Sequence, residues 1–174
     1  MFLELIAVIF AGLAAAGLVM MGGRAFRGRL PRWLAPVAAA VSMIGVTIAL
    51  EYGWYGRTRA ALPEGLTVAE TVEHESIYRP WTYAVPYVDR FAALDTAGLM
   101  SHPAHPDIFL AEIFFFGRWA PVSRASALLD CGGWRRALVE DGAEIGTDAL
   151  PEGLAWVAAE PEDAILTTAC DGRA

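Results

Sequence analysis

Two long apolar runs dominate the first third of the chain. Residues 2–22 contain one ionisable side chain, Glu4, and residues 33–50 contain none. Each run approaches the roughly 20 residues with which an α-helix crosses about 30 Å of hydrocarbon. The pattern therefore predicts a transmembrane hairpin: two helices over about residues 2–22 and 33–52, joined by residues 23–32.

A cleaved signal peptide is the alternative interpretation of the first run. Such peptides begin with a positive charge and carry an apolar core of about 7–15 residues. Residues 1–4 of this chain carry no positive side chain, and the apolar core that follows them is longer. These features favour a retained membrane span.

The segment between the two runs is basic. It contains four arginines and no acidic residue, at Arg24, Arg27, Arg29 and Arg32. Loops rich in Lys or Arg stay preferentially in the cytoplasm, and the tail ahead of the first run has neither. We therefore expect a multi-pass protein of a bacterial inner membrane, with its N-terminus and C-terminal domain in the periplasm.

Small residues within the two runs are candidates for close helix packing. They are Gly12, Ala16 and Gly17 in the first run and Gly45 in the second. Small side chains let the backbones of membrane helices approach each other, which could serve assembly into a larger complex. The alternative is that Ala and Gly are simply common in such a sequence. Neither run has an ionisable residue at mid-span, which argues against ion-coupled transport.

Beyond the second run, the pattern changes to that of β-strands. Residues 66–75 alternate apolar and polar side chains at period 2, which is typical of a half-buried strand. Further strands are expected over residues 81–88, 108–116, 123–129 and 134–139, and a short helix from Pro161 to about Cys170, closed by Gly172. We therefore expect residues 1–55 to form the membrane part and residues 56–174 one β-rich domain, sandwich or barrel-like.

Aromatic side chains cluster in two stretches of this domain. They are Tyr78, Trp81, Tyr83 and Tyr87, and then Phe114, Phe115, Phe116 and Trp119. These side chains could line a binding groove. Because aromatic residues are enriched in strands, we expect them instead to form the core.

The charge is divided unevenly along the 174 residues. Residues 1–52 carry four Arg and two acids, whereas residues 53–174 carry nine Arg and eighteen acids. An acidic domain is unsuited to phosphate backbones, so nucleic acid is not expected as a partner, whereas a basic periplasmic protein is an option. Solubility alone is the simpler explanation of the acidity.

Three residue types are missing altogether, and their absence excludes some chemistry. The chain has no Lys, Asn or Gln, which favours a GC-rich bacterial genome. Without Lys there can be no Schiff-base catalysis and no Walker A lysine, and without Asn there is no N-glycosylation site. No serine lies in a Gly-x-Ser-x-Gly motif, so a nucleophile elbow is not expected either.

Both cysteines, Cys131 and Cys170, fall in the part expected outside the cytoplasm. An oxidising compartment favours a disulfide between them. Two separate buried thiols are the alternative. A redox-active pair is less favoured, because the spacing is not that of a Cys-x-x-Cys motif.

The same region resembles a known family. The stretch 87–89 (Tyr-Val-Asp), then Asp130-Cys131 followed by Trp134-Arg135-Arg136, and a C-terminal helix carrying Cys170 are similar to the surface-adhesin protein E type of small periplasmic domain. The similarity covers about half of the chain. It implies a β-rich domain with a bridge between the two cysteines.

Histidines and carboxylates offer a candidate metal site. His102, His105 and Asp107 lie together in a proline-rich loop, and His74 stands between two glutamates. Imidazole and carboxylate groups at such spacing could hold zinc or copper. Because no fourth ligand at fixed spacing is visible, we expect a solvated loop and no metal.

These patterns together predict a non-enzymatic inner-membrane protein without a cofactor. We expect it to act as an accessory or assembly subunit of a membrane complex, with integral membrane proteins and the lipid bilayer as partners. The alternative is a membrane-tethered periplasmic module that binds a ligand or a metal. An enzyme is a third option, because many active sites leave no sequence signature.

Overall fold

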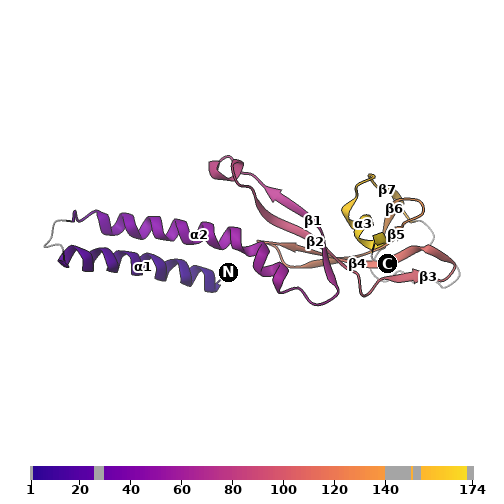
Figure 1. The fold of residues 1–174 in the computed structure, drawn as a ribbon, viewed down its shortest axis with the longest axis horizontal. Coiled ribbons are helices and arrows are strands. Elements are labelled where there is room, and N and C mark those ends of the chain that lie inside the picture. Colours follow the sequence, from indigo (N-terminus) through magenta and orange to yellow (C-terminus); the bar gives the residue numbers. More distant parts are fainter. Residues whose placement is uncertain (1, 26–29, 140–149, 151–153, 172–174) are drawn as a thin grey trace. The chain divides into compact units, whose positions relative to one another are not determined.

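The computed structural model describes residues 2–25, 30–139, 150 and 154–171, and it divides into two compact units. The first unit, Met1–Arg57, contains two long helices, α1 (Phe2–Ala25) and most of α2 (Leu34–Ala60) (Figure 1). Both helices are long and apolar enough to cross a membrane, which confirms the two predicted apolar helices. Each extends past its apolar run. The apolar run indicates only the part of a helix that hydrocarbon could cover, and the helix can continue beyond that part. Helix α2 continues to Ala60 and ends ahead of Pro63, a residue that helices tolerate poorly.

The two helices pack together around Gly12, which is the buried residue of α1. A Cβ atom placed on Gly12 would lie 2.8 Å from Cγ of Met43 on α2. Beside this contact, the hydroxyl of Ser42 donates a hydrogen bond to the backbone oxygen of Ala11 at 3.2 Å. The glycine therefore makes room for a partner side chain, and a polar group next to it joins the helices.

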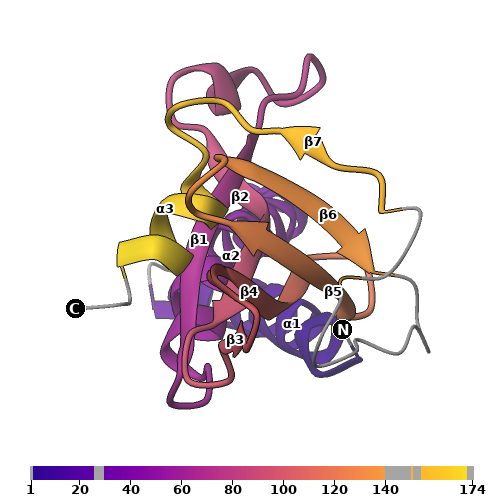
Figure 2. The same cartoon turned by 90° about the vertical axis from the view of Figure 1, so that its right-hand side faces the viewer.

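The second unit, Thr58–Ala174, is a curled antiparallel sheet (Figure 2). Its strands run in the order β1-β2-β4-β5-β6-β7, and β3 pairs with β4. The strands are β1 (Leu66–His74), β2 (Tyr87–Asp95), β3 (Met100–His102), β4 (His105–Gly117), β5 (Ser123–Asp130), β6 (Arg135–Val139) and β7 (Val157–Ala158), and helix α3 (Ala164–Asp171) follows them. Most neighbours in the sheet are consecutive in the sequence, so the fold is largely a meander.

The core of this domain lies between one face of the sheet and α3. Helix α3 packs against β1, β2 and β5. It contributes three buried residues, Ile165, Leu166 and Ala169, to a cluster whose sheet members include Leu94 and Leu129. A short helix therefore covers this face of the curled sheet.

Helix α3 begins later than the sequence indicated. Asp163 caps it, because Oδ1 accepts hydrogen bonds from the backbone N–H groups of Ile165 and Leu166, both at 3.1 Å. Pro161 lies in the turn ahead of the helix. The expected closing residue, Gly172, lies outside the described residues.

The strand expected over residues 81–88 is wrong. A 3-10 helix, η1 (Pro80–Tyr83), occupies its first half, and β2 begins at Tyr87 and runs to Asp95. Pro80 starts a helical turn readily, whereas a proline cannot donate to a strand ladder. The four residues 91–94 of β2 are buried in succession, and such a strand lacks the alternation by which strands are recognised.

Candidate functional site at one end of the sheet

Two connections lie at the same end of the sheet. Residue Val72 of β1 pairs with Arg90 of β2, and Arg90 in turn pairs with Gly117 of β4. The β1–β2 connection (residues 75–86) and the β4–β5 connection (residues 118–122) therefore leave the sheet at one end. We call these two connections together the aromatic tip.

A buried hydroxyl helps to order the longer connection. Thr82 is 1% exposed, and its Oγ1 accepts a hydrogen bond from the backbone N–H of Ser76 at 2.9 Å. The same hydroxyl donates to the backbone oxygen of Arg79 at 2.8 Å. The N–H of Arg79 donates to the oxygen of Ser76 at 2.9 Å, which closes a turn. The connection is thus a structured loop.

Large apolar side chains on this loop point into solvent. They are Ile77, Tyr78, Trp81, Tyr83 and Val85 on the β1–β2 connection, joined by Trp119 and Val122 on the β4–β5 connection. Ile77 is 85% exposed and Trp119 is 63% exposed. A group of exposed apolar residues on a structured surface is typical of an interaction site.

The prediction that the aromatic residues form the core is therefore wrong for five of the eight. Tyr87 is buried, and Phe114 and Phe116 are half-buried, in agreement with the prediction. The exposed members are Tyr78, Trp81, Tyr83, Phe115 and Trp119. The prolines at positions 80, 86 and 121 were the available signal, because they place most of these rings in connections, where no second layer covers them.

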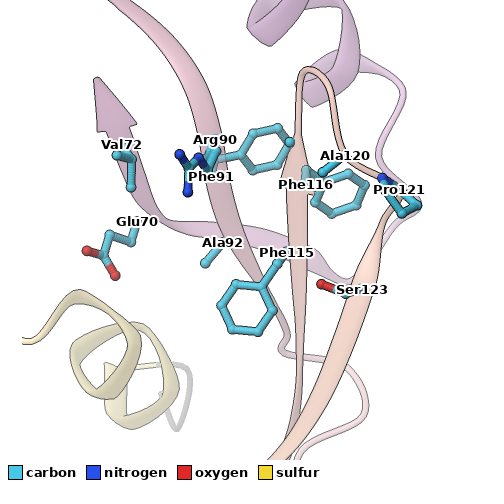
Figure 3. Close-up of a pocket in the computed structure, with 11 residues that line it drawn as sticks. Glu70, Val72, Arg90, Phe91, Ala92, Phe115, Phe116, Ala120, Pro121 and Ser123 are labelled. Carbon is cyan, nitrogen blue, oxygen red and sulfur yellow. The ribbon is translucent and has the colours of Figure 1, made fainter. Parts of the chain in front are cut away.

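An apolar pocket of about 270 Å³ lies next to the tip (Figure 3). The rings of Phe91 and Phe116, which stack with centroids 4.7 Å apart, form part of its wall. Phe115 and Pro121 also line it, and Glu70 and Arg90 are the charged residues among its described lining. Because most of its lining is apolar, this pocket would accept an apolar group in preference to a charged one.

A second hollow, of about 460 Å³, lies on the α3 side of the sheet. Glu70 and Phe115 line both hollows, so the two adjoin. The second is also lined by Arg136, Leu138 and Ile165.

The turn between β5 and β6 joins the C-terminal segment to the sheet. Cys131 in this turn is bonded to Cys170 of α3, which confirms the predicted disulfide. The indole N–H of Trp134 donates to the backbone oxygen of Glu160 at 2.6 Å, and Arg136 lies 3.1 Å from Oδ2 of Asp163. The residues from 131 to 136 are thus structural connectors.

Asp130 holds this turn in shape. Its Oδ1 accepts hydrogen bonds from the N–H groups of Gly132 at 3.0 Å and Gly133 at 2.8 Å, and its Oδ2 accepts one from Nε of Arg135 at 2.7 Å. Burial by itself would raise the pKa of Asp130. The hydrogen bonds from Gly133 and Arg135, the charge of Arg135 and the hydrogen bond from Gly132 outweigh burial and hold the pKa below its ordinary value.

The candidate metal ligands are divided between several places. His102 and His105 lie together, with ring centroids 5.3 Å apart, and Nδ1 of His102 accepts a hydrogen bond from the N–H of Ala104. The side chain of Asp107 lies next to Gly132. His74 contacts Asp89, with 3.9 Å between Nδ1 and Oδ2. Among the described residues, no three His, Cys, Asp or Glu side chains are grouped as a metal would require.

The residues that were expected to set topology and packing lie in the first unit. Arg24 lies in the last turn of α1 and Arg32 lies in the turn before α2, whereas Arg27 and Arg29 lie outside the described residues. Of the small residues, Gly12 packs against α2. A Cβ atom on Gly17 or Gly45 would meet nothing within 4 Å, and Ala16 is half-buried.

Comparisons of the chain with protein-family models, with curated proteins and with solved structures found no match. The resemblance to the surface-adhesin protein E type of domain therefore stays a prediction. Any functional conclusion has to come from the chain itself.

Proposed function

We propose that this chain is a two-span inner-membrane protein that serves as an accessory or assembly subunit of a membrane complex. The observation that carries the proposal is the uncovered apolar surface of α1 and α2. Phe10 and Leu13, for example, are 67% and 65% exposed. Such a surface needs lipid or other membrane helices around it.

The proposed orientation rests on charge and on the cysteines. The arginines between the helices favour a cytoplasmic hairpin, which would put both ends of the chain in the periplasm. The disulfide between Cys131 and Cys170 supports this orientation, because such bonds persist in oxidising compartments.

The small residues on the outer surface of the helix pair supply a place for partner helices. Gly17 and Gly45 have open space where a Cβ atom would be. Small residues at such positions allow a further helix to approach closely. In this role the acidic domain would present a soluble surface to the periplasm, and no catalytic group or cofactor is needed.

The hollows on the sheet favour a second candidate function, a tethered periplasmic module that binds an apolar ligand. The larger hollow, of about 460 Å³, falls within the size range of small-molecule sites. Native mass spectrometry of the chain purified from its own membranes would detect such a ligand as added mass. A module that binds a metal has less support, because His74 lies apart from the other candidate ligands and contacts Asp89.

Topology is tested with reporters. A reporter that is active only in the cytoplasm should work when inserted between residues 28 and 30 and fail when fused after Ala174. The opposite pattern would place the cysteines in a reducing compartment and overturn the proposed orientation.

Complex formation is tested by mild detergent extraction and native gels. We expect the wild-type chain to migrate with co-purifying membrane proteins, and Gly17→Leu or Gly45→Leu to release them. Ala40→Leu is the matched control, because Ala40 is another small, exposed residue of α2 outside the proposed surface. A strictly monomeric wild-type band would refute the proposal.

A further inference from the structure

We propose that the aromatic tip, residues 75–86 and 118–122, inserts into the headgroup region of the lipid bilayer. The inference rests on the proposed membrane insertion of α1 and α2. It adds a second contact with lipid, made by the β-domain.

The first argument is the kind of side chain that is exposed. The tip presents two Trp, two Tyr, one Ile and two Val to solvent. Trp and Tyr are enriched at membrane interfaces, where an apolar ring and a polar N–H or O–H group are both accommodated. Exposed Ile77 and Val85 add apolar area that water disfavours.

The second argument is the position of the basic groups. The guanidinium of Arg79 lies over the ring of Tyr78, 5.7 Å from its centroid, and that of Arg118 lies over the ring of Trp119 at 5.1 Å. Each connection thus pairs a cation with an exposed ring. Such a pair suits the interface, where an apolar ring and a cation are accommodated side by side.

The third argument is the distribution of charge, which favours lipid over a basic protein. The tip carries two Arg, one Glu and no Asp, whereas residues 53–174 as a whole carry nine Arg and eighteen acids. The acidic remainder of the domain is repelled by an anionic membrane, and the tip is not. A basic protein would be drawn to the acidic remainder instead.

The fourth argument is reach. Five residues separate the end of α2 at Ala60 from the start of β1 at Leu66, and β1 has nine residues. At about 3.3 Å per residue, the linker and β1 together extend roughly 45 Å at most. The tip is therefore held within that distance of the end of α2. At such a distance its effective concentration at the bilayer is high, so that weak insertion suffices.

Fluorescence of the full chain in lipid vesicles tests the proposal. A single cysteine is introduced at Ile77, which is exposed, and labelled with a thiol-reactive NBD fluorophore while the native disulfide stays oxidised. The matched control is Ser101→Cys, an exposed site on β3, beyond the opposite end of β2. The vesicles contain phosphatidylcholine and phosphatidylglycerol with spin-labelled lipid.

We expect the label at position 77 to shift its emission to the blue and to be quenched several-fold more strongly than the label at position 101. Adding Trp81→Ser and Trp119→Ser together should lower the quenching at position 77. Met100→Ser, which removes an exposed apolar side chain from β3, should leave it unchanged. These variants alter exposed side chains, so folding is expected to persist, and formation of the native disulfide reports on it.

Equal and weak quenching at positions 77 and 101 would overturn the proposal. Shielding of position 77 in native membranes but not in lipid vesicles would also overturn it, because the occupant would then be a protein. Alkaline carbonate extraction of the same vesicles reports separately whether the helices are inserted. The two measurements thereby distinguish a tip that does not enter the bilayer from helices that do not insert. The native gels test the formation of a complex independently.

Discussion

Nε of Arg135 donates a hydrogen bond to Oδ2 of Asp130 across a 2.7 Å separation, at the turn that also carries the disulfide. Asp130 is 6% exposed, so its charge is compensated by this arginine and by the two glycine N–H groups that meet Oδ1. A buried carboxylate that is held in this way contributes to stability only while it is ionised.

Asp130→Asn should therefore lower the free energy of unfolding of the β-domain at neutral pH, by about 1–3 kcal/mol. Urea titration of the full chain in detergent, followed by tryptophan fluorescence, measures it. Glu73→Gln is the control, because Glu73 is an exposed residue of β1 and loses one charge in the same way. An equal loss in both variants would show that net charge, and not the turn, is responsible.

The same pair predicts how stability depends on pH. Because the folded pKa of Asp130 is lowered, its contribution is fully present above the unfolded pKa, about 3.9. It is lost as the pH falls from there through the folded pKa. Below the folded value, the wild-type chain and Asp130→Asn should approach each other in stability. Urea titrations at a series of pH values test this, and a constant difference down to the lowest pH would contradict it.

Removal of the disulfide should destabilise the β-domain and leave the proposed membrane insertion of α1 and α2 unchanged. Cys131→Ser and Cys170→Ser should each cost about 2–5 kcal/mol, because the bond closes a loop with a sequence separation of 39. The double variant should cost little more than either single one, since each already removes the same cross-link. Non-reducing mass mapping is the direct check, and free thiols at both positions in protein from the membrane would refute the bridge.

The cap of α3 can be tested with two adjacent acids. Asp163→Ala removes the hydrogen bonds to Ile165 and Leu166 and the ion pair with Arg136, so we expect a loss of about 1–2 kcal/mol. Glu162→Ala should have a small effect, because Glu162 is exposed. Urea titration compares the two variants, and equal effects would contradict the capping role.

The contact between the two long helices predicts a difference between two glycines of α1. Gly12→Leu should displace Met43 and weaken the helix pair by about 1–3 kcal/mol. Gly17→Leu should leave the pair intact, since it has open space around it. Far-UV circular dichroism melts of the full chain in mild detergent measure both. A lower melting temperature for Gly17→Leu than for Gly12→Leu would contradict the observed packing.

The sequence by itself determined the elements whose signal is local. The lengths of the two apolar runs predicted the long helices, and the alternation over residues 66–75 predicted β1, because each pattern lies within one element. The pairing of Cys131 with Cys170 followed from the expected compartment, which is a property of the whole chain.

Only the tertiary structure decided which side chains are covered. Ala92 and Leu94 of β2 are buried in a cluster with residues of α3, which packs on this face of the sheet although it lies about 70 residues further along the chain. Trp81 and Trp119 have the same local character as core aromatics, yet they lie in connections beyond the end of the sheet, where no further layer covers them. Exposure depends on contacts between residues far apart in the chain, and hydropathy at a single position does not record them.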